Sequence, residues 1–370
     1  MKPIRVLQVV TTMERAGLET MLMNYYRHID HDIVQFDFLR HRDGSHAYDE
    51  EIRALGGKIY TVPSFNPLNT NGYKNELDKF FAEHNEYRIV HSHLDCLSSV
   101  PLKYAKKYGV PVRIAHSHVS KMTFDLKYPI RMFYRARIPN VATDLFACSK
   151  EAGKWMYGMH PFRVIPNAID CRAFFYNETV ATHLREEHGL VGKFVVAHVG
   201  RFDAVKNHSF LLDVFRDIVN IYDNCVLLLA GIGPTMDEIK LKAKNYGIND
   251  KVRFVGSISN VPDLLTVADV FVFPSLYEGL GISLIEAQAA GLPCYASKGC
   301  VPEDSNVTGR VTFLSLESGA KSWASEVLKA RFVSPVRNNA AAKLIASGFD
   351  ITVEAHALQE YYVQNYREES

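Results

Sequence analysis

Residues 269–293, DVFVFPSLYEGLGISLIEAQAAGLP, contain the pattern that decides the fold. The β-branched and aromatic run at 269–275 predicts a buried strand. A glycine-rich turn follows it, and the apolar run after Gly281 predicts a helix. A strand that passes through a short turn into a helix is the βα unit from which parallel sheets are built.

The same unit recurs along the chain in two successive series. The first series predicts strands at 4–10, 33–39, 58–62, 88–93, 112–116, 144–148 and 163–166. The second predicts strands at 193–200, 225–231, 251–256, 269–275 and 293–297. The segment IPNAID (165–170) interrupts the rhythm with a proline and an asparagine. We therefore predict an α/β protein with two facing Rossmann-like domains that join near residue 167.

Composition agrees with a two-domain soluble protein. The 370 residues are enough for two domains, and 47% hydrophobic with 22% charged residues is a normal globular mixture. The formal net charge of +1 gives no overall field for nucleic acid, so no nucleic-acid partner is expected. The six cysteines form no CxxC pair, and no apolar run resembles a signal peptide or a membrane span. These features predict a cytoplasmic location.

The turn after the strand at 193–200 is the first candidate site. Ligands of open parallel sheets bind at the carboxyl ends of the strands. Here Gly200 is followed by Arg201 and Lys206, just before an apolar helix. A guanidinium fork, an ammonium and helix-terminal amides together suit a diphosphate. The alternative is an exposed loop with ordinary surface cations.

The next two turns offer main-chain contacts. Gly231 and Gly233 would let a ligand approach the backbone closely. Their spacing matches neither GxGxxG nor a Walker motif, so it does not indicate NAD or ATP. Gly256, Ser257 and Ile258 follow the strand at 251–256 and could contact a planar base.

Two glutamates lie eight positions apart in the opening stretch. Glu278 lies in the glycine-rich turn, where a carboxylate can accept hydrogen bonds from two sugar hydroxyls. Glu286 lies in the following helix and could bind the vicinal hydroxyls of a ribose. The alternatives are a helix-capping acid and a solvated helix face. Apolar neighbours on both sides of Glu286 favour a partnered acid.

Four histidines end two strands of the first series, in HSHLD (91–95) and AHSHVS (115–120). Three interpretations stay open at this point. The pattern H-x-H suits a zinc site, although no cysteine or acidic ligand accompanies it at catalytic spacing. The histidines could instead be structural, or they could hydrogen-bond a hydroxyl or a phosphate.

The segment KMTFDLKYPIRMFYRAR (121–137) combines cations with aromatic side chains. Its net charge is +4, from Lys121, Lys127, Arg131, Arg135 and Arg137 against Asp125. Such a segment suits an anionic membrane surface that carries a lipid-linked acceptor. The alternative is a solvated amphipathic helix.

Together these motifs resemble the family 4 glycosyltransferases of GT-B fold, over essentially the whole chain. EGLGISLIEAQAAGLP (278–293) matches the family's Glu-x7-Glu motif at Glu278 and Glu286. VGRF (199–202) with KNH (206–208), and NVPDLLTVADVFVFPS (260–275), are further matches. AGLE (16–19) is similar to the family's GGxE loop, with Ala16 in place of the first glycine. IPNAID resembles the interdomain hinge, and the style of the sequence is that of bacterial exopolysaccharide and capsule enzymes.

The resemblance implies an organisation and an activity. Residues 1–166 would bind the acceptor, 167–349 the nucleotide sugar, and 350–370 would return as a helix to the first domain across an interdomain cleft. The enzyme would be a retaining glycosyltransferase for surface polysaccharide, located in the cytoplasm or at the inner face of the membrane. It would use a nucleotide diphosphate sugar, a UDP sugar before others, with no metal or other cofactor, and a glycan or lipid-linked acceptor. A catalytically silent nucleotide-sugar-binding subunit and a GT-B epimerase or phosphorylase are the alternatives.

The resemblance also assigns roles. Arg201 and Lys206 would hold the diphosphate as it leaves, Glu278 the transferred sugar and Glu286 the ribose. One of His116 or His118 would lie near the sugar. An alanine at position 16 would restrict its loop if positive φ is required there. The residues expected to act in catalysis are Arg201, Lys206, Glu278, His116 and His118. Those expected to bind the donor are Gly17, Gly200, Gly231, Ser257, Ile258, Gly279, Leu280, Gly281, Ile282 and Glu286.

Overall fold

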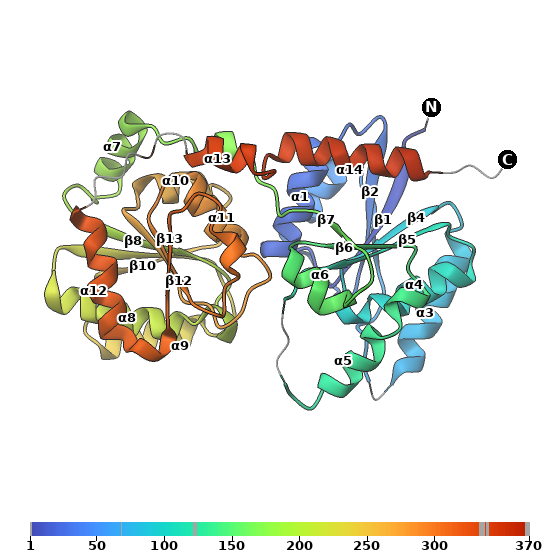
Figure 1. Ribbon diagram of the computed structural model, residues 1–370, viewed down its shortest axis with the longest axis horizontal. Coiled ribbons are helices and arrows are strands. Elements are labelled where there is room, and N and C mark those ends of the chain that lie inside the picture. Colours follow the sequence, from blue (N-terminus) through green and yellow to red (C-terminus); the bar gives the residue numbers. More distant parts are fainter. Residues whose placement is uncertain (1, 68, 121–123, 333–336, 338–339, 367–370) are drawn as a thin grey trace. The chain divides into compact units, whose positions relative to one another are not determined.

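The computed structural model describes residues 2–67, 69–120, 124–332, 337 and 340–366. The chain forms two compact units (Figure 1). The first unit is Met1–Ala168 with Ile351–Ser370, and the second is Ile169–Asp350. The sequence placed these boundaries after residues 166 and 349.

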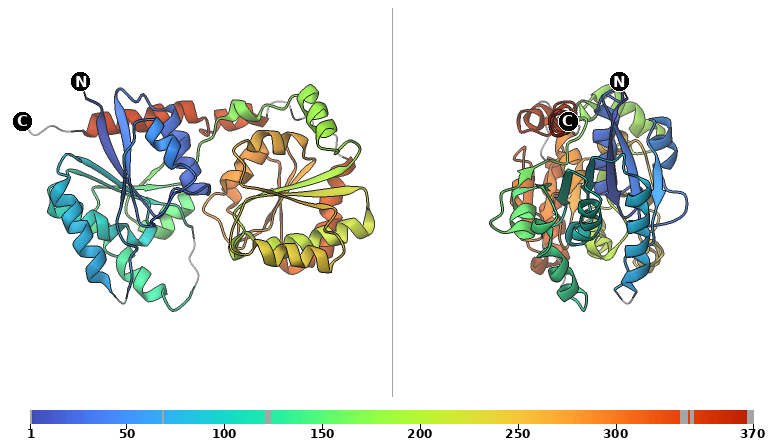
Figure 2. Two further views of the ribbon diagram at one scale, coloured as in Figure 1. Left: turned by 180° about the vertical axis from the view of Figure 1, so that it is seen from behind. Right: turned by 90° about the vertical axis from the view of Figure 1, so that its right-hand side faces the viewer.

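The first unit is built on a parallel sheet in the order β3-β2-β1-β4-β5-β6-β7. Its strands are β1 (Ile4–Val10), β2 (Val34–Arg40), β3 (Ile59–Thr61), β4 (Ile89–Ser92), β5 (Val112–Ser117), β6 (Asp144–Ala147) and β7 (Arg163–Val164). All seven residues of β2 are buried, as expected for a parallel strand with helices over both faces. The two sheets of the molecule, each between its helices, are visible from behind in Figure 2.

Most helices of the first unit lie between consecutive strands, as the βα pattern predicts. They are α1 (Gly17–His28), α2 (Asp49–Ala54), α3 (Thr70–Glu83), α4 (Ser99–Lys107), α5 (Tyr128–Arg135) and α6 (Lys150–Tyr157). The last helix, α14 (Ile351–Asn365), also belongs to this unit and packs against α1. The side chain of Gln359 accepts a hydrogen bond from the Asp30 amide at 2.6 Å, and Tyr362 is fully buried. The prediction that the C-terminal helix crosses back is therefore confirmed.

The second unit has a parallel sheet in the order β10-β9-β8-β11-β12-β13. Its strands are β8 (Phe194–Val199), β9 (Cys225–Ala230), β10 (Val252–Gly256), β11 (Val270–Phe273), β12 (Cys294–Ser297) and β13 (Val311–Leu314). Its helices are α7 (Glu178–Glu187), α8 (His208–Ile221), α9 (Met236–Asn245), α10 (Val261–Val267), α11 (Ile282–Ala289), α12 (Gly319–Leu328) and α13 (Ala340–Ala346). The sequence missed β13, because this four-residue edge strand buries only Val311 fully.

In both sheets the strand order reverses once. In the first unit the reversal lies between β1 and β4, and in the second between β8 and β11. Ligands of open parallel sheets bind at the carboxyl ends of the strands beside such a reversal. The loops that follow these four strands are therefore where a site is expected. Within the described residues no helix is long and apolar enough to cross a membrane.

Candidate functional site

The loops after β8 and β11 meet at the reversal point of the second unit. The amide of Leu276 donates to the carbonyl of Val205 at 2.8 Å. The side-chain amide of Asn207 donates to the carbonyl of Pro274 at 3.2 Å. Asn207 can hold this position because it adopts the left-handed conformation, with φ of 55°. One main-chain and one side-chain hydrogen bond thus join the two loops.

Lys206 and Glu278 form an ion pair across these loops. The ammonium Nζ and the carboxylate Oε1 are 2.5 Å apart, with side chains 19% and 11% exposed. Lys206 ends a single 3₁₀ turn, Ala204–Lys206, in which the amides of Val205 and Lys206 donate to the Asp203 carboxylate. Its ammonium also lies 4.8 Å from the ring centroid of Phe273, in cation–π range. The site therefore holds one cation and one carboxylate side by side, both partly accessible.

Arg201, the second predicted cation, takes a more open position. Its guanidinium Nε lies 4.0 Å from the Asp203 carboxylate, and 47% of its side chain is exposed. It follows β8 directly, as predicted, and it is available to an anion that approaches this edge of the sheet.

At two glycines of these loops, a side chain would clash with neighbouring atoms. Gly281 caps α11 with φ of 81°, and a Cβ there would lie 2.9 Å from the ring of Phe273. A Cβ on Gly231 would lie 2.0 Å from the carbonyl oxygen of Gly200. Close packing of neighbouring strand ends thus explains Gly231 without a ligand. Gly281 lets the chain turn from β11 into α11 directly beside Phe273.

Glu286 is buried inside the second unit, with 7% of its surface exposed. All eight residues of α11 are buried, so the alternative of a solvated helix face is wrong. No hydrogen bond or ion pair joins its carboxyl to another described residue. Burial raises the pKa of Glu286 to about 8, so the group is mostly protonated at pH 7. A buried, unpartnered carboxyl is costly, and a ligand with hydroxyl donors would satisfy it.

The remaining predicted donor contacts lie along the same edge of the sheet. Ser257 is exposed and Ile258 half-buried after β10, the outermost strand. Gly279 is half-buried, while Leu280 and Ile282 are buried in the turn that opens α11.

The loop after β1 in the first unit is relaxed around Ala16. This residue has φ of −131° and ψ of 173°, an extended conformation open to any residue. The expected penalty for alanine in the GGxE-like loop therefore does not arise. Gly17 opens α1 and is exposed, and Glu19 is buried in the first turn of that helix.

The four histidines lie together: His91 and His116 are in β4 and β5, and His93 and His118 directly follow these strands. Residues i and i+2 of a strand share a face, and β4 pairs directly with β5. Neighbouring rings lie with their centroids 4.2–5.2 Å apart. Burial lowers the pKa of His118 to about 3 and the pKa values of the other three well below 6.5. All four rings are therefore neutral at pH 7.

Hydrogen bonds occupy both nitrogens of two of these rings. His91 bonds Tyr362 and His116, while His93 bonds Gln8 and His118. His91 and His93 thus have the structural role that was one of the three open interpretations. Nε2 of His116 and Nδ1 of His118 are buried and have no hydrogen-bond partner among the described residues. One nitrogen each from His91, His93 and His116 also lies within 4.8 Å of the others, which is close enough to share a metal ion.

Sequence reasoning missed three residues around these histidines. Tyr362 lies 271 positions from His91, so no local signal could join them. Gln8 is a buried polar residue within the apolar run VLQVV (6–10) of β1, and this exception is its one local signal. Asp95 follows HSHL directly and its carboxylate accepts from the His118 amide at 2.8 Å, although its own φ is 49°. Burial raises the pKa of Asp95 to about 7.

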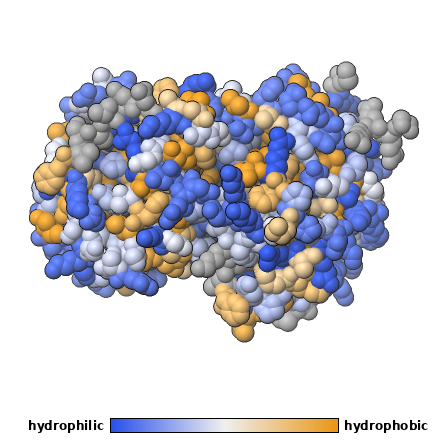
Figure 3. All heavy atoms as spheres, in the orientation of Figure 1, coloured by the Kyte–Doolittle hydropathy of each residue, from blue (hydrophilic) through white to orange (hydrophobic). Residues whose placement is uncertain are grey.

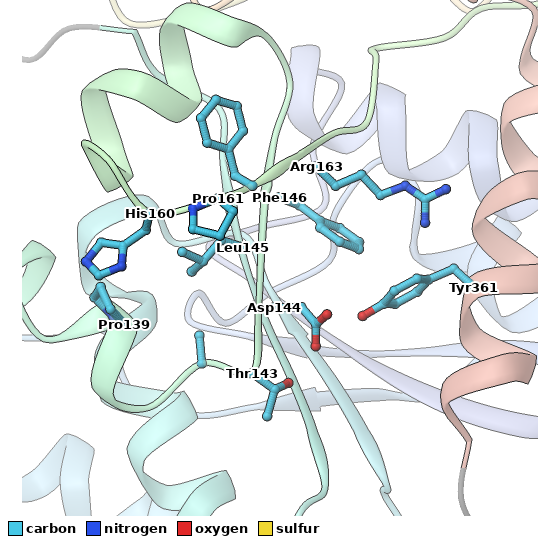
Figure 4. Close-up of a pocket in the computed structure, with 11 residues that line it drawn as sticks. Pro139, Thr143, Asp144, Leu145, Phe146, His160, Pro161, Arg163 and Tyr361 are labelled. Atoms are coloured by element: carbon cyan, nitrogen blue, oxygen red, sulfur yellow. The ribbon is translucent and has the colours of Figure 1, made fainter.

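A cavity of about 580 Å³ lies at the opposite edge of the first sheet (Figure 4). It is formed by residues that enter β6 and β7, by residues of β6 itself, and by Tyr361 of α14. The lining residues are Pro139, Ala142, Thr143, Asp144, Leu145, Phe146, His160, Pro161, Phe162, Arg163 and Tyr361. The ring of Phe146 lies between this cavity and the histidines, with its centroid 5.5 Å from that of His91 and 6.0 Å from that of His116.

Comparisons with known proteins point in one direction. Residues 181–330 match the family model described as glycosyl transferases group 1. EpsF of Bacillus subtilis (strain 168), a protein classed as a glycosyltransferase, is 37% identical over 368 residues, covering 97% of this chain and 96% of EpsF. The capsular polysaccharide biosynthesis glycosyltransferase CapH of Staphylococcus aureus is 24% identical over 97% of this chain and 99% of its own. The crystal structure of Anabaena HepE with UDP-glucose matches with a TM-score of 0.79 at 18% identity, over 97% of this chain and 99% of HepE.

Proposed function

The chain belongs to the group 1 glycosyltransferases, and on this premise we propose that it is a retaining enzyme that uses a nucleotide diphosphate sugar. UDP sugars are the first candidates, since HepE of the same fold was crystallised with UDP-glucose. The proposed acceptor is a glycan or a lipid-linked sugar in surface polysaccharide synthesis, in line with the capsular role in the name of CapH. The proposed place of reaction is the cytoplasm, with contact to the inner face of the membrane.

The contact between Lys206 and Glu278 carries this proposal. It lies at the strand-order reversal, and it joins a group suited to the diphosphate with a group suited to sugar hydroxyls. A nucleotide sugar presents these two parts next to each other. When the glycosyl–phosphate bond breaks, negative charge develops on the diphosphate, and Lys206 and Arg201 stabilise it. The amides of Gly279 to Ile282 lie at the start of α11, where anions and hydroxyls bind well.

Glu286 completes the donor site in this proposal by binding the ribose. Two ribose hydroxyls that donate to its carboxyl favour the charged form and so lower its pKa. No cofactor is proposed, because Lys206 and Arg201 supply the positive charge that a divalent cation supplies at other diphosphate sites. These residues together favour an active enzyme over a silent binding subunit.

A thermal-shift screen of UDP, GDP and ADP sugars on the full chain tests the proposal. A sugar nucleotide at 100 times its Kd stabilises the protein by about 2.7 kcal/mol. The best binder is then incubated with the enzyme, and the released nucleotide and the anomer of the product are identified by NMR. Stabilisation by UDP sugars with turnover and a retained anomer supports the proposal. Absence of stabilisation by every nucleotide sugar, or binding without turnover with any acceptor, rejects the enzyme.

The proposed membrane contact is the segment around α5. Lys121 and the two residues after it lie outside the described residues. In the described part, Phe124 is 86% and Leu126 98% exposed, and Phe133 is exposed on α5 itself. Figure 3 shows hydrophobic atoms gathered at the lower edge of this lobe, beside hydrophilic ones. Exposed apolar side chains next to cations are the combination that binds anionic lipid surfaces.

The structure also selects the variant that tests this contact. Arg135 lies over the ring of Trp155 and donates to the Met156 carbonyl, so neutralising it would disturb the fold as well. Replacement of Phe124 and Leu126 by serine removes apolar area alone. We expect this variant to lose co-sedimentation with vesicles of phosphatidylglycerol, while Met159→Ser, a fully exposed control in the same unit, retains it. Unchanged co-sedimentation of the double variant rejects the membrane contact.

A further inference from the structure

Five buried side chains of the first unit and the half-buried His118 form one continuous hydrogen-bonded relay. The members of this histidine relay are Gln8, Tyr362, His91, His93, His116 and His118. One arm runs from Tyr362 through His91 to His116, over 2.8 and 3.1 Å. The other runs from Gln8 through His93 to His118, over 2.9 Å at each step. The side-chain amide of Gln8 joins the arms by donating to the Tyr362 hydroxyl at 3.4 Å.

The bonding rules of the neutral groups fix the direction of every bond. Gln8 Oε1 only accepts, so His93 must carry its proton on Nε2 and accept at Nδ1. His118 must then donate from Nε2, which leaves its Nδ1 as an acceptor. In the other arm the Tyr362 hydroxyl accepts from Gln8 and donates to His91 Nδ1. His91 Nε2–H therefore donates to His116 Nδ1, which leaves His116 Nε2 as a donor.

The relay thus ends in one donor and one acceptor, on rings whose centroids are 4.2 Å apart. These two terminal atoms are the two buried ring nitrogens of the four histidines that have no partner among the described residues. Turning the Gln8 amide by 180° would reverse every bond in both arms. The result would again be one donor and one acceptor, with their places exchanged, because both arms meet at the same amide.

A donor beside an acceptor matches the bonding pattern of a hydroxyl group, which both accepts and donates. A buried donor or acceptor that makes no hydrogen bond costs about 1–3 kcal/mol, so these two nitrogens favour a bound hydroxyl. We propose that Gln8 and Tyr362 are positioning residues that fix the tautomers of His116 and His118 for hydroxyls of a sugar substrate. This rests on the proposed function, and the sugar is that of the donor or of the acceptor. Tyr362 of helix α14, near the C-terminal end of the sequence, would thereby influence sugar recognition by the histidines.

The tautomers are measured directly, without any substrate. Two-bond ¹⁵N–¹H correlation spectra of the full chain with labelled histidine distinguish the Nδ1–H and Nε2–H forms. The relay predicts that His91, His93, His116 and His118 all have the same tautomer, assigned through single His→Gln variants. Two different tautomers within the four, or a charged ring at pH 7, overturn the relay even if the enzyme transfers sugar.

A conservative variant tests how the arms are held. Tyr362→Phe removes the group that fixes His91, so the His91–His116 arm is expected to show mixed tautomers. The His93–His118 arm keeps its form, because Gln8 still accepts from it. Gln8→Met releases both arms and serves if the Tyr362→Phe protein does not fold. Tyr361→Phe, on the neighbouring residue that lines the cavity, is the control and is expected to leave all four unchanged.

Titrations locate the hydroxyl. If the hydroxyl belongs to the donor, Tyr362→Phe raises the Kd for UDP-glucose about 10-fold and leaves the Kd for UDP unchanged. If the hydroxyl belongs to the acceptor, the Kd values for UDP and UDP-glucose are both unchanged. In that case the KM for the acceptor rises about 10-fold, while the KM for the donor does not. Either result supports the role of the relay in sugar recognition. Equal losses of affinity for UDP and UDP-glucose, or no change in any of these constants, overturn it.

A metal analysis is a second test. A stoichiometric amount of transition metal in the purified protein, detected by mass spectrometry, also overturns the relay, since the metal would bind the nitrogens that otherwise form the hydrogen bonds. Failure of the wild type to bind any nucleotide sugar rejects the proposed function but leaves the tautomer result intact.

Discussion

The two units bury their polar groups in opposite ways. The first unit buries neutral rings, four histidines that share hydrogen bonds with an amide and a phenol. The second keeps an ion pair of Lys206 and Glu278 at its sheet edge and a protonated Glu286 behind it. Neutral donors and acceptors suit hydroxyls, while a fixed cation suits a phosphate that gains charge. Under the proposed function, the first unit would therefore bind sugar hydroxyls and the second would bind the diphosphate.

A fall in pH should lower the free energy of unfolding of the first unit far more than that of the second. Buried neutral histidines have lowered pKa values, so the unfolded chain binds more protons below pH 6.5 and stability falls as pH falls. From pH 7.5 to 5.5 each such histidine costs about 1.4 kcal/mol. The first unit has five, the four of the relay and His41, partly offset by Asp95, whose raised pKa works in the opposite direction. We expect a loss on the order of 4 kcal/mol there.

In the second unit the two effects nearly cancel. His198 and His208 lower the stability of this unit over the same pH range, since burial lowers their pKa values to about 4 and about 2. Glu286 has a raised pKa, so it increases the stability of the unit as pH falls from 8 towards 4.5. The chain has two tryptophans, Trp155 in the first unit and Trp323 in the second, so Trp323→Phe and Trp155→Phe variants report the units separately in urea melts. Equal acid sensitivity of both units would contradict the comparison.

Replacement of Lys206 by methionine should have the largest effect on catalysis. The change keeps about the same side-chain length and removes the charge that we propose stabilises the leaving diphosphate. We expect kcat to fall about 100- to 1,000-fold. Lys240→Met, which removes a half-exposed lysine of the same unit, is the control in the same transfer assay. A Lys206→Met enzyme with near-normal kcat would remove the central cation from the mechanism.

The loop glycines provide a smaller and purely structural contrast. Gly281→Ala places a Cβ 2.9 Å from Phe273 at positive φ, and should destabilise the second unit by about 1–3 kcal/mol in urea melts. Ala16→Gly changes a residue with extended backbone in the corresponding loop of the first unit. It should cost less than about 1 kcal/mol, through the entropy of the unfolded chain alone. A larger effect at position 16 would show that the loop depends on alanine.

The smallest predicted effect is a fraction of one proton. Glu286, whose pKa burial raises to about 8, is protonated at pH 7 and should release its proton when ribose hydroxyls donate to it. Calorimetric titration of UDP in phosphate and in Tris buffer gives the number of protons released, and we expect between half and one. Glu286→Gln should bring the number near zero. Proton release that persists in this variant would assign it to another group.

The sequence was sufficient to predict twelve strands and the candidate site residues at their ends. Period and turn signals are local, so Arg201, Lys206 and Glu278 could be located by their position after strands. The edge strand β13 escaped because only one of its four residues is fully buried. The burial of Glu286 and the relay depend on contacts between distant segments, and the partnership of His91 with Tyr362 has no local signature. The backbone of Ala16 needed coordinates as well, since a family pattern does not state φ.

The division of labour between the units is tested most directly by one calorimetric series. UDP is titrated into the wild type, Lys206→Met and Tyr362→Phe under the same conditions. We predict that Lys206→Met loses most of the affinity for UDP, while Tyr362→Phe binds UDP as the wild type does. Equal loss of UDP affinity in both variants, or undiminished binding by Lys206→Met, would contradict the account.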